Sequence, residues 1–155
     1  MKQLTVLFLV RGNQVLLAMK KRGFGAGRWN GVGGKVEPGE TIEQAVIREC
    51  EEEIEVTPND CKKVAEITFH EQHNGTLDTL NVHVFICESW EGKPVETEEM
   101  APQWFAKDSL PLKEMWADDP YWLPQVITGK LLRCEFWLDE NDQVSKQEVQ
   151  EVENL

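Results

Sequence analysis

Three glutamates in one stretch have the spacing of a metal-binding helix face. Glu49, Glu52 and Glu53 stand at positions i, i+3 and i+4, so a helix projects all three side chains from one face. Their like charges repel each other and call for a counter-charge. Mg²⁺ is a hard cation that prefers oxygen ligands and commonly completes its shell with substrate phosphates. The spacing therefore favours a Mg²⁺ site for a phosphorylated ligand, although a glutamate-rich helix on its own is more often a solvated face.

The surrounding residues strengthen the metal-binding interpretation. Gly33 and Gly34 precede the glutamates and let the backbone come close to a ligand or metal. Arg48 lies among the acids and can hold a carboxylate in a fixed geometry. The chain has 155 residues and a formal charge of −12, which argues against binding to nucleic acid. A dication between carboxylates and phosphates would let this acidic protein bind an acidic small molecule.

Hydrophobic periodicity predicts the elements that position these residues. Residues 41–54 form an amphipathic helix, and residues 118–129 form a second helix with a bend at Pro124. Strands are expected at 4–10, 14–19, 64–69, 79–86, 102–106, 131–138 and 144–152. The glycine-rich segment before the first helix is a loop or an interrupted strand. The pattern predicts one α+β (mixed α/β) domain over residues 1–155, and it leaves open whether the end of the chain completes the sheet.

The N-terminal apolar run and the cysteines predict a compartment. Residues 4–10 are too few to span a membrane, and Arg11 follows where a signal peptide would have a small-residue cleavage site. None of the four cysteines forms a C-x-x-C pair, so a zinc or redox motif lacks its spacing. We expect buried apolar thiols in a cytoplasmic protein that does not associate with membranes.

The stretch GKVEPGETIEQAVIRECEEEIEV resembles the Nudix box, G-x5-E-x7-R-E-U-x-E-E-x-G-U, in which U is a bulky apolar residue. The matching residues are Gly34, Glu40, Arg48, Glu49, Cys50, Glu52, Glu53 and Val56. Glu55 stands where the family has glycine; a left-handed conformation there costs on the order of 1 kcal/mol unless the turn is built differently. The resemblance implies the Nudix fold, a central mixed β-sheet sandwiched between α-helices, and hydrolysis of a nucleoside diphosphate linked to another group.

The resemblance also implies roles for the acidic residues, with Mg²⁺ or Mn²⁺ as the cofactor. The implied metal ligands are Gly33, through its carbonyl, Glu49, Glu52, Glu53 and, from another loop, Glu99. The implied catalytic residues are Glu40, Arg48, Glu49, Glu52 and Glu53. Among them, Glu53 is our choice for the acceptor of the proton of the attacking water, and Glu40 and Arg48 orient the others.

Two further segments, MKKRGFGAGRWNGVGGKV and MWADDPYW, resemble the family members that hydrolyse oxidised purine nucleoside triphosphates to the monophosphate and pyrophosphate. The substrate-binding residues that this implies are Thr5, Lys20, Phe24, Asn30, Val32, Gly33, Gly34, Lys35, Phe69, Trp116, Ala117, Asp118, Asp119 and Trp122. The aromatic members can stack on a purine. In an enclosed pocket one carboxyl of the aspartate pair stays protonated, and the pair then offers a donor and acceptors to the base. We expect a monomer whose partner is the nucleotide.

Departures from that pattern leave two other functions open. Glu71 replaces an aromatic residue, Leu80 a methionine, Asn81 an acid and Ala117 a proline, so the substrate could be another nucleoside diphosphate derivative or an ordinary triphosphate. The Glu55 departure opens a second alternative, a nucleotide-binding module without catalysis. Each pocket residue also has a plain structural alternative, since aromatic residues are most often core and an aspartate pair before proline is a common helix start.

Overall fold

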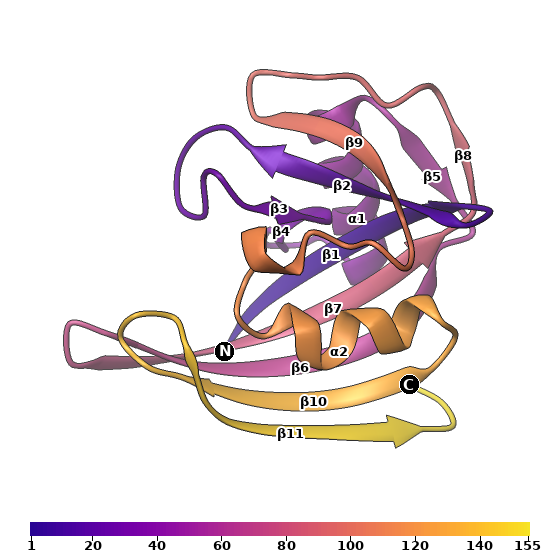
Figure 1. The fold of residues 1–155 in the computed structure, drawn as a ribbon. Helices are drawn as coiled ribbons and strands as arrows, with labels where there is room; N and C mark the ends of the chain where they lie inside the picture. The colour runs from indigo at the N-terminus through magenta and orange to yellow at the C-terminus, as the bar shows by residue number, and fades with distance from the viewer.

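The computed structural model describes residues 1–155 as one large mixed sheet with a helix on either side (Figure 1). The sheet has nine strands in the order β11-β10-β6-β7-β1-β2-β3, and β4 pairs with β1 while β9 pairs with β2. Its strands are β1 (Lys2–Arg11), β2 (Gln14–Lys20), β3 (Trp29–Asn30), β4 (Val32–Lys35), β6 (Lys62–His73), β7 (Thr76–Cys87), β9 (Met100–Ala106), β10 (Leu131–Leu138) and β11 (Val144–Val152). The pairs β1–β7 and β6–β10 are parallel and the others antiparallel.

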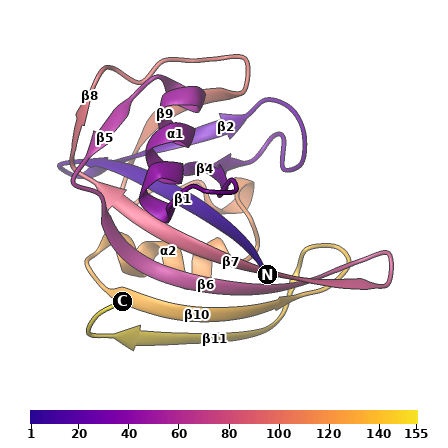
Figure 2. The same cartoon turned by 180° about the vertical axis from the view of Figure 1, so that it is seen from behind.

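The two α-helices cover opposite faces of the sheet. Helix α1 (Ile42–Ile54) lies behind β1 in Figure 1 and in front of it in Figure 2, whereas α2 (Asp119–Ile127) lies in front of β6 in Figure 1 and behind it in Figure 2. Neighbouring residues of β1 therefore enter different cores, because side chains alternate across a strand. Leu7 packs in the core under α1, and Phe8 packs in the core under α2. Burial on both faces explains why β1 is a continuous apolar run.

Helix α1 begins at the capping box that Thr41 makes with Gln44. The Thr41 hydroxyl accepts from the Gln44 N–H, and the Gln44 side chain accepts from the Thr41 N–H, so two N-terminal donors are satisfied. At the other end, Glu55 adopts the left-handed conformation with φ 59° and ψ 38°. The chain thus builds the family's turn without its glycine, and the backbone carries the associated strain.

The helices and strands expected from the sequence are present. The two central strands β6 and β7 extend beyond the predicted residues 64–69 and 79–86. Strands β6 and β7 continue to a two-residue turn at Asn74 and Gly75, both with positive φ, as tight hairpins require. The glycine-rich segment contains β3 and β4, and the C-terminal segment pairs with β10 and completes the sheet. Sequence periodicity missed the short pair β5 (Thr57–Asn59) and β8 (Ser89–Glu91) and the 3₁₀ turn Leu112–Glu114.

Two smaller expectations need adjustment. Helix α2 contains Pro124 but ends at Ile127, before Gly129. All four cysteines are free, and three are buried as expected, whereas Cys61 is partly exposed. None of the helices has the length and apolar character that crossing a membrane would require.

Candidate active site

Two glycines of β4 bring helix α1 against the sheet. A Cβ atom on Gly33 would lie 1.8 Å from the carbonyl oxygen of Thr5, and one on Gly34 would lie 2.9 Å from the carboxylate of Glu49. Only glycine fits at position 33, where the neighbouring atoms are backbone, whereas a side chain at position 34 would displace the Glu49 carboxylate. The close approach lets the Gly33 N–H donate to Oε1 of Glu53 at 2.9 Å, which fixes this carboxyl against the sheet.

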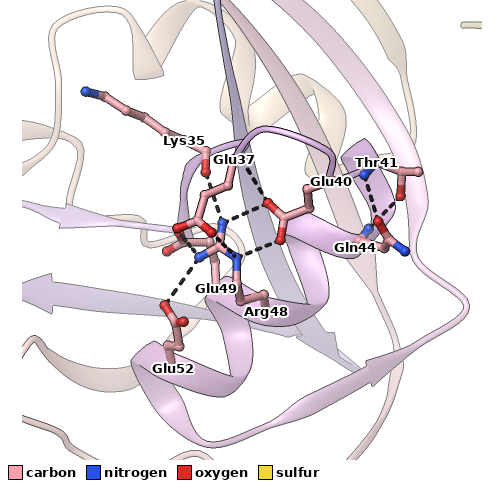
Figure 3. A network of polar contacts seen from close by, with 8 residues as sticks. All are labelled: Lys35, Glu37, Glu40, Thr41, Gln44, Arg48, Glu49 and Glu52. Carbon is pink, nitrogen blue, oxygen red and sulfur yellow. Dashed lines mark hydrogen bonds and ion pairs between the residues drawn. The ribbon is translucent and has the colours of Figure 1, made fainter.

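Arg48 holds the carboxylates of this helix in place (Figure 3). Its Nε and Nη2 donate to the two oxygens of Glu40 at 2.7 and 3.0 Å, a bidentate pair, and Nη1 donates to Glu49 at 2.7 Å. Nη2 also donates to the carbonyl oxygen of Lys35 at 3.0 Å. These bonds, helped by the Glu37 N–H, lower the pKa of Glu40 to about 2. Arg48 and Glu40 therefore act as positioning residues that stay ionised.

Glu53 is a buried acid without a positive partner. Its side chain reaches a cavity of about 340 Å³ lined by Lys20, Arg22, Gly33, Gly34, Glu49, Glu53, Glu99 and Met100. Burial first, and then the charge of Glu49, raises the pKa of Glu53 to about 8. Glu99, from the segment before β9, adds a third acid to the same cavity, and its charge contributes to the raised pKa of Glu53. Sequence reasoning placed these three acids in one site, and the fold brings them together.

The donor set of this cavity fits a divalent cation. Carboxylate oxygens are the ligands that hard dications prefer, and a dication would neutralise acids that otherwise repel each other in a buried place. Glu49, Glu53 and Glu99 are the residues positioned to hold it. Glu52 differs, because its side chain is mostly exposed and pairs with Nη1 of Arg48 at 3.3 Å. It lies outside the lining of the cavity.

A second cavity, of about 270 Å³, lies against the sheet beside the first one. The predicted residues that line it are Thr5, Lys20, Phe24, Asn30, Gly33, Gly34, Phe69, Trp116, Asp118, Asp119 and Trp122. Three predicted residues do not line it. Val32 is buried in the core under α1, Lys35 is exposed and contributes its carbonyl to Arg48, and Ala117 precedes the aspartates without lining the cavity.

Aromatic rings form the mouth and the walls of this cavity. Phe24 stacks on Trp116 with ring centroids 5.2 Å apart and is 65 % exposed, although exposure of so large an apolar ring costs free energy. Phe69 and Trp122 also line the cavity. Phe69 stacks on Phe136, and Trp122 is buried edge-on against Phe8. The arrangement gives a flat purine both an exposed platform and a rigid wall.

The two aspartates lie at the buried end of the cavity. Oδ2 of Asp118 accepts from Nε1 of Trp122 at 2.8 Å, and Oδ2 of Asp119 accepts from the Trp116 N–H at 3.1 Å. Asp118 is the N-cap of α2 but its side chain makes no capping bond, so helix capping does not account for it. Burial raises the pKa of both, and the charge of Asp118 raises that of Asp119 further. Burial and their mutual charge thus favour one proton held by the pair.

Two more polar groups complete the lining. The Thr5 hydroxyl is buried and has no hydrogen-bond partner, a costly state that a ligand would relieve. The Oδ1 atom of Asn30 accepts from the Gly31 N–H at 2.8 Å, so its amide NH₂ is the group available to a base.

Sequence reasoning overlooked several residues that the fold brings to the cavities. Arg28 stacks over Trp116 with its guanidinium carbon 4.2 Å from the ring centroid, and Arg22 lines the acidic cavity. Met100 and Leu138 also contribute to the lining. They come from segments far apart in the chain, and no local pattern distinguishes them from ordinary loop or core residues.

Comparison with known proteins agrees with this geometry. The family model of the NUDIX domain matches residues 1–126. The chain is 44 % identical over 154 residues to the oxidized purine nucleoside triphosphate hydrolase of Danio rerio, covering 99 % of this chain and 97 % of that one. It is 41 % identical over 151 residues to the protein of the same name from Mus musculus, covering 97 % and 96 %. The MutT protein of Bacillus halodurans has a crystal structure that superposes with a TM-score of 0.83 and 24 % identity, over 97 % of this chain and 98 % of that chain; at that identity the likeness concerns the fold alone.

Proposed function

The chain belongs to the Nudix family, and on that premise we propose that it hydrolyses oxidised purine nucleoside triphosphates to the nucleoside monophosphate and pyrophosphate. The observation that carries the proposal is the junction of the two cavities. Both are lined by Lys20, Gly33, Gly34, Glu53 and Met100. A nucleotide whose base lies between Phe24 and the aspartate pair therefore extends its phosphates toward the acidic cavity.

The base pocket supports recognition of a purine edge by protonation state. With one proton held by the aspartate pair, Asp118 and Asp119 together present a donor and acceptors side by side. A shift of that proton would let the same pair read more than one purine edge. Thr5 and the amide NH₂ of Asn30 add two groups that can hydrogen-bond the nucleotide. Oxidised purines differ from ordinary ones in such edge patterns, which gives the pocket a basis for choosing between them.

The acidic cavity supports hydrolysis at phosphorus. Members of this family typically depend on a divalent metal, and we propose Mg²⁺, held by Glu49, Glu53 and Glu99 with Glu52 at the edge. When bound, the ion supplies charge neutralisation for the phosphate oxygens and lowers the pKa of water. In the reaction a water oxygen bonds to the α-phosphorus, the bond to the bridging oxygen breaks, and pyrophosphate leaves with the electron pair. Glu53 accepts the proton of the water, while Arg48 and Glu40 keep Glu49 oriented.

The remaining properties follow from the same proposal. We take residues 1–155 as one catalytic domain that acts as a monomer on a nucleotide. The four free thiols suit a reducing compartment such as the cytoplasm.

One specific observation favours a different substrate. Glu71 lines the base pocket, half-buried, with its pKa raised by burial, at a position where related enzymes carry an aromatic ring. An extra acid in the pocket changes which base edge binds best, so another nucleoside diphosphate derivative or an ordinary triphosphate is the second candidate.

The test is steady-state pyrophosphate release with Mg²⁺, comparing 8-oxo-dGTP, 2-oxo-dATP, dGTP and dATP. We expect kcat/KM to favour an oxidised nucleotide by roughly tenfold or more, about 1.4 kcal/mol of transition-state binding. Equal kcat/KM values for all four nucleotides would be consistent with hydrolysis but would refute the preference for damaged purines. Turnover that persists unchanged in Glu53→Gln would refute the catalytic assignment.

A further inference from the structure

A second group of potential metal ligands lies at the rim of the base pocket, away from the carboxylates of α1. Glu71 and His73 are on β6, close to the tip of the β6–β7 hairpin, and Asp142 is in the turn between β10 and β11. Figures 1 and 2 both show this tip and this turn side by side. One ligand atom from each of the three residues lies within 4.8 Å of the other two.

The distances in this cluster are slightly longer than those between ligands of one metal ion. Nε2 of His73 lies 3.9 Å from Oε1 of Glu71 and 3.9 Å from Oδ1 of Asp142, too far for a hydrogen bond. Ligands bound at about 2.0–2.2 Å to one ion stand roughly 3–3.6 Å apart. The His73 nitrogen would need to approach each oxygen by roughly half an ångström to reach that spacing, and the ligand atoms of Glu71 and Asp142 lie within 4.8 Å of each other.

The electrostatics of the cluster favour a cation. Oδ1 of Asp142 is shielded from solvent and has no hydrogen-bond partner. The His73 ring, 3.9 Å away, compensates its charge only when the imidazole is protonated, whereas a bound cation would compensate it in either state of the ring. Burial raises the pKa of Glu71. The nearby His73 lowers it, and the charges of Asp142 and Asp78 raise it by smaller amounts. Two acids that repel each other beside one imidazole are a set that a dication would satisfy.

We propose that Glu71, His73 and Asp142 bind a divalent transition metal ion of the Zn²⁺ class at a site separate from the catalytic one. An imidazole with two carboxylates selects Zn²⁺ and similar ions, whereas Mg²⁺ prefers oxygen ligands alone. The ion would join the β6–β7 tip to the β10–β11 turn. It would also act on the base pocket, since Glu71 lines that pocket and the His73 ring meets Phe24 edge-on at 6.4 Å between centroids.

The test is a Zn²⁺ titration of the intact protein in saturating Mg²⁺, followed by ¹⁵N NMR of the histidine rings. The chain has three histidines, so each ring can be followed separately. We expect the ring nitrogens of His73 to shift, with one equivalent bound at micromolar concentration, while His70 and His83 stay unchanged. Zn²⁺ that binds the free thiols leaves the His73 signals where they are, and that result would overturn the proposal.

Variants test the ligand assignment without removing the fold. Asp142→Asn keeps the shape of the side chain and removes its charge, and His73→Gln removes the imidazole from a partly exposed position. Each should weaken Zn²⁺ binding by at least tenfold in calorimetry with Mg²⁺ present. The matched control is His70→Gln, because His70 is on the same strand and pairs with Glu135 instead. Wild-type Zn²⁺ affinity in Asp142→Asn, or equal losses in His70→Gln and His73→Gln, would show that the cluster is an ion-pair group only.

Discussion

Replacing Glu53 by glutamine should stabilise the metal-free protein while abolishing hydrolysis. Glu53 is only 4 % exposed, and burial and the Glu49 charge raise its pKa from 4.5 to about 8. Unfolded, this carboxyl ionises near pH 4.5, so the folded state is penalised increasingly as the pH rises from there to about 8. At about 1.4 kcal/mol per pH unit, the penalty is on the order of 3 kcal/mol at pH 7.

Glutamine removes that penalty and keeps the local bonds. Its side-chain oxygen can still accept from the Gly33 N–H, and its NH₂ can donate to Glu49. Urea unfolding in EDTA, followed by tryptophan fluorescence between pH 4.5 and 8.5, measures the difference in free energy of unfolding. We expect almost no difference at pH 4.5 and a difference on the order of 3 kcal/mol in favour of Glu53→Gln at pH 7. Added Mg²⁺ should reduce the difference, because it stabilises the wild type more.

The control is Glu43→Gln, which removes a charge from an exposed glutamate in the first turn of the same helix. Its effect should stay within about 0.5 kcal/mol at every pH. The reasoning would be refuted if Glu53→Gln were less stable than the wild type at pH 7. A difference that does not change with pH would equally refute it, because the effect would then come from packing rather than from ionisation.

Three further substitutions separate base recognition from stability. Asp119→Asn keeps an acceptor for the Trp116 N–H but removes a titrating carboxyl of the pair, so kcat/KM for the oxidised purine should fall roughly tenfold. We expect the wild-type kcat/KM to decline at alkaline pH, because burial raises the pKa of the pair, and we expect the variant to flatten that decline. Phe24→Ala removes an exposed stacking platform, so KM should rise about tenfold while urea unfolding shows less than about 0.5 kcal/mol of change. Glu55→Gly should raise the free energy of unfolding by about 1 kcal/mol, because glycine accepts the left-handed conformation, with kcat and KM unchanged; a lower melting temperature would contradict this.

The fold was largely predictable because its elements carry local signals. The run of β1 and the spacing of α1 each reflect which faces of an element are buried. The exceptions are elements without such a signal. The segments β3 and β4 are short and rich in glycine, and β5 pairs with β8 far along the chain, so their strand character comes from the partner and not from their own residues.

The candidate site was predictable only where a motif fixes the spacing along the chain. The acids of α1 and the aspartate pair lie close together in sequence, and the fold keeps them together. Glu99 required a resemblance, because a lone glutamate in an acidic loop carries no signal. Arg28 and Leu138 became pocket residues only through tertiary contacts. Val32 is the opposite case. Its place in the glycine-rich segment led to a prediction of substrate binding, but its side chain packs in the core under α1.

The two departures from the family pattern have different consequences because their side chains go to different places. Glu55 occupies a position inside the Nudix box, yet its side chain is exposed and lines neither cavity. The Glu55 departure therefore destabilises the fold through its left-handed backbone conformation and leaves the residues of the two cavities unchanged. Glu71 lies outside the box, but it enters the base pocket and faces His73 and Asp142 at the rim. A substitution outside the motif is thus the one expected to change what this enzyme binds, and the one inside it is expected to change only how stably the protein folds.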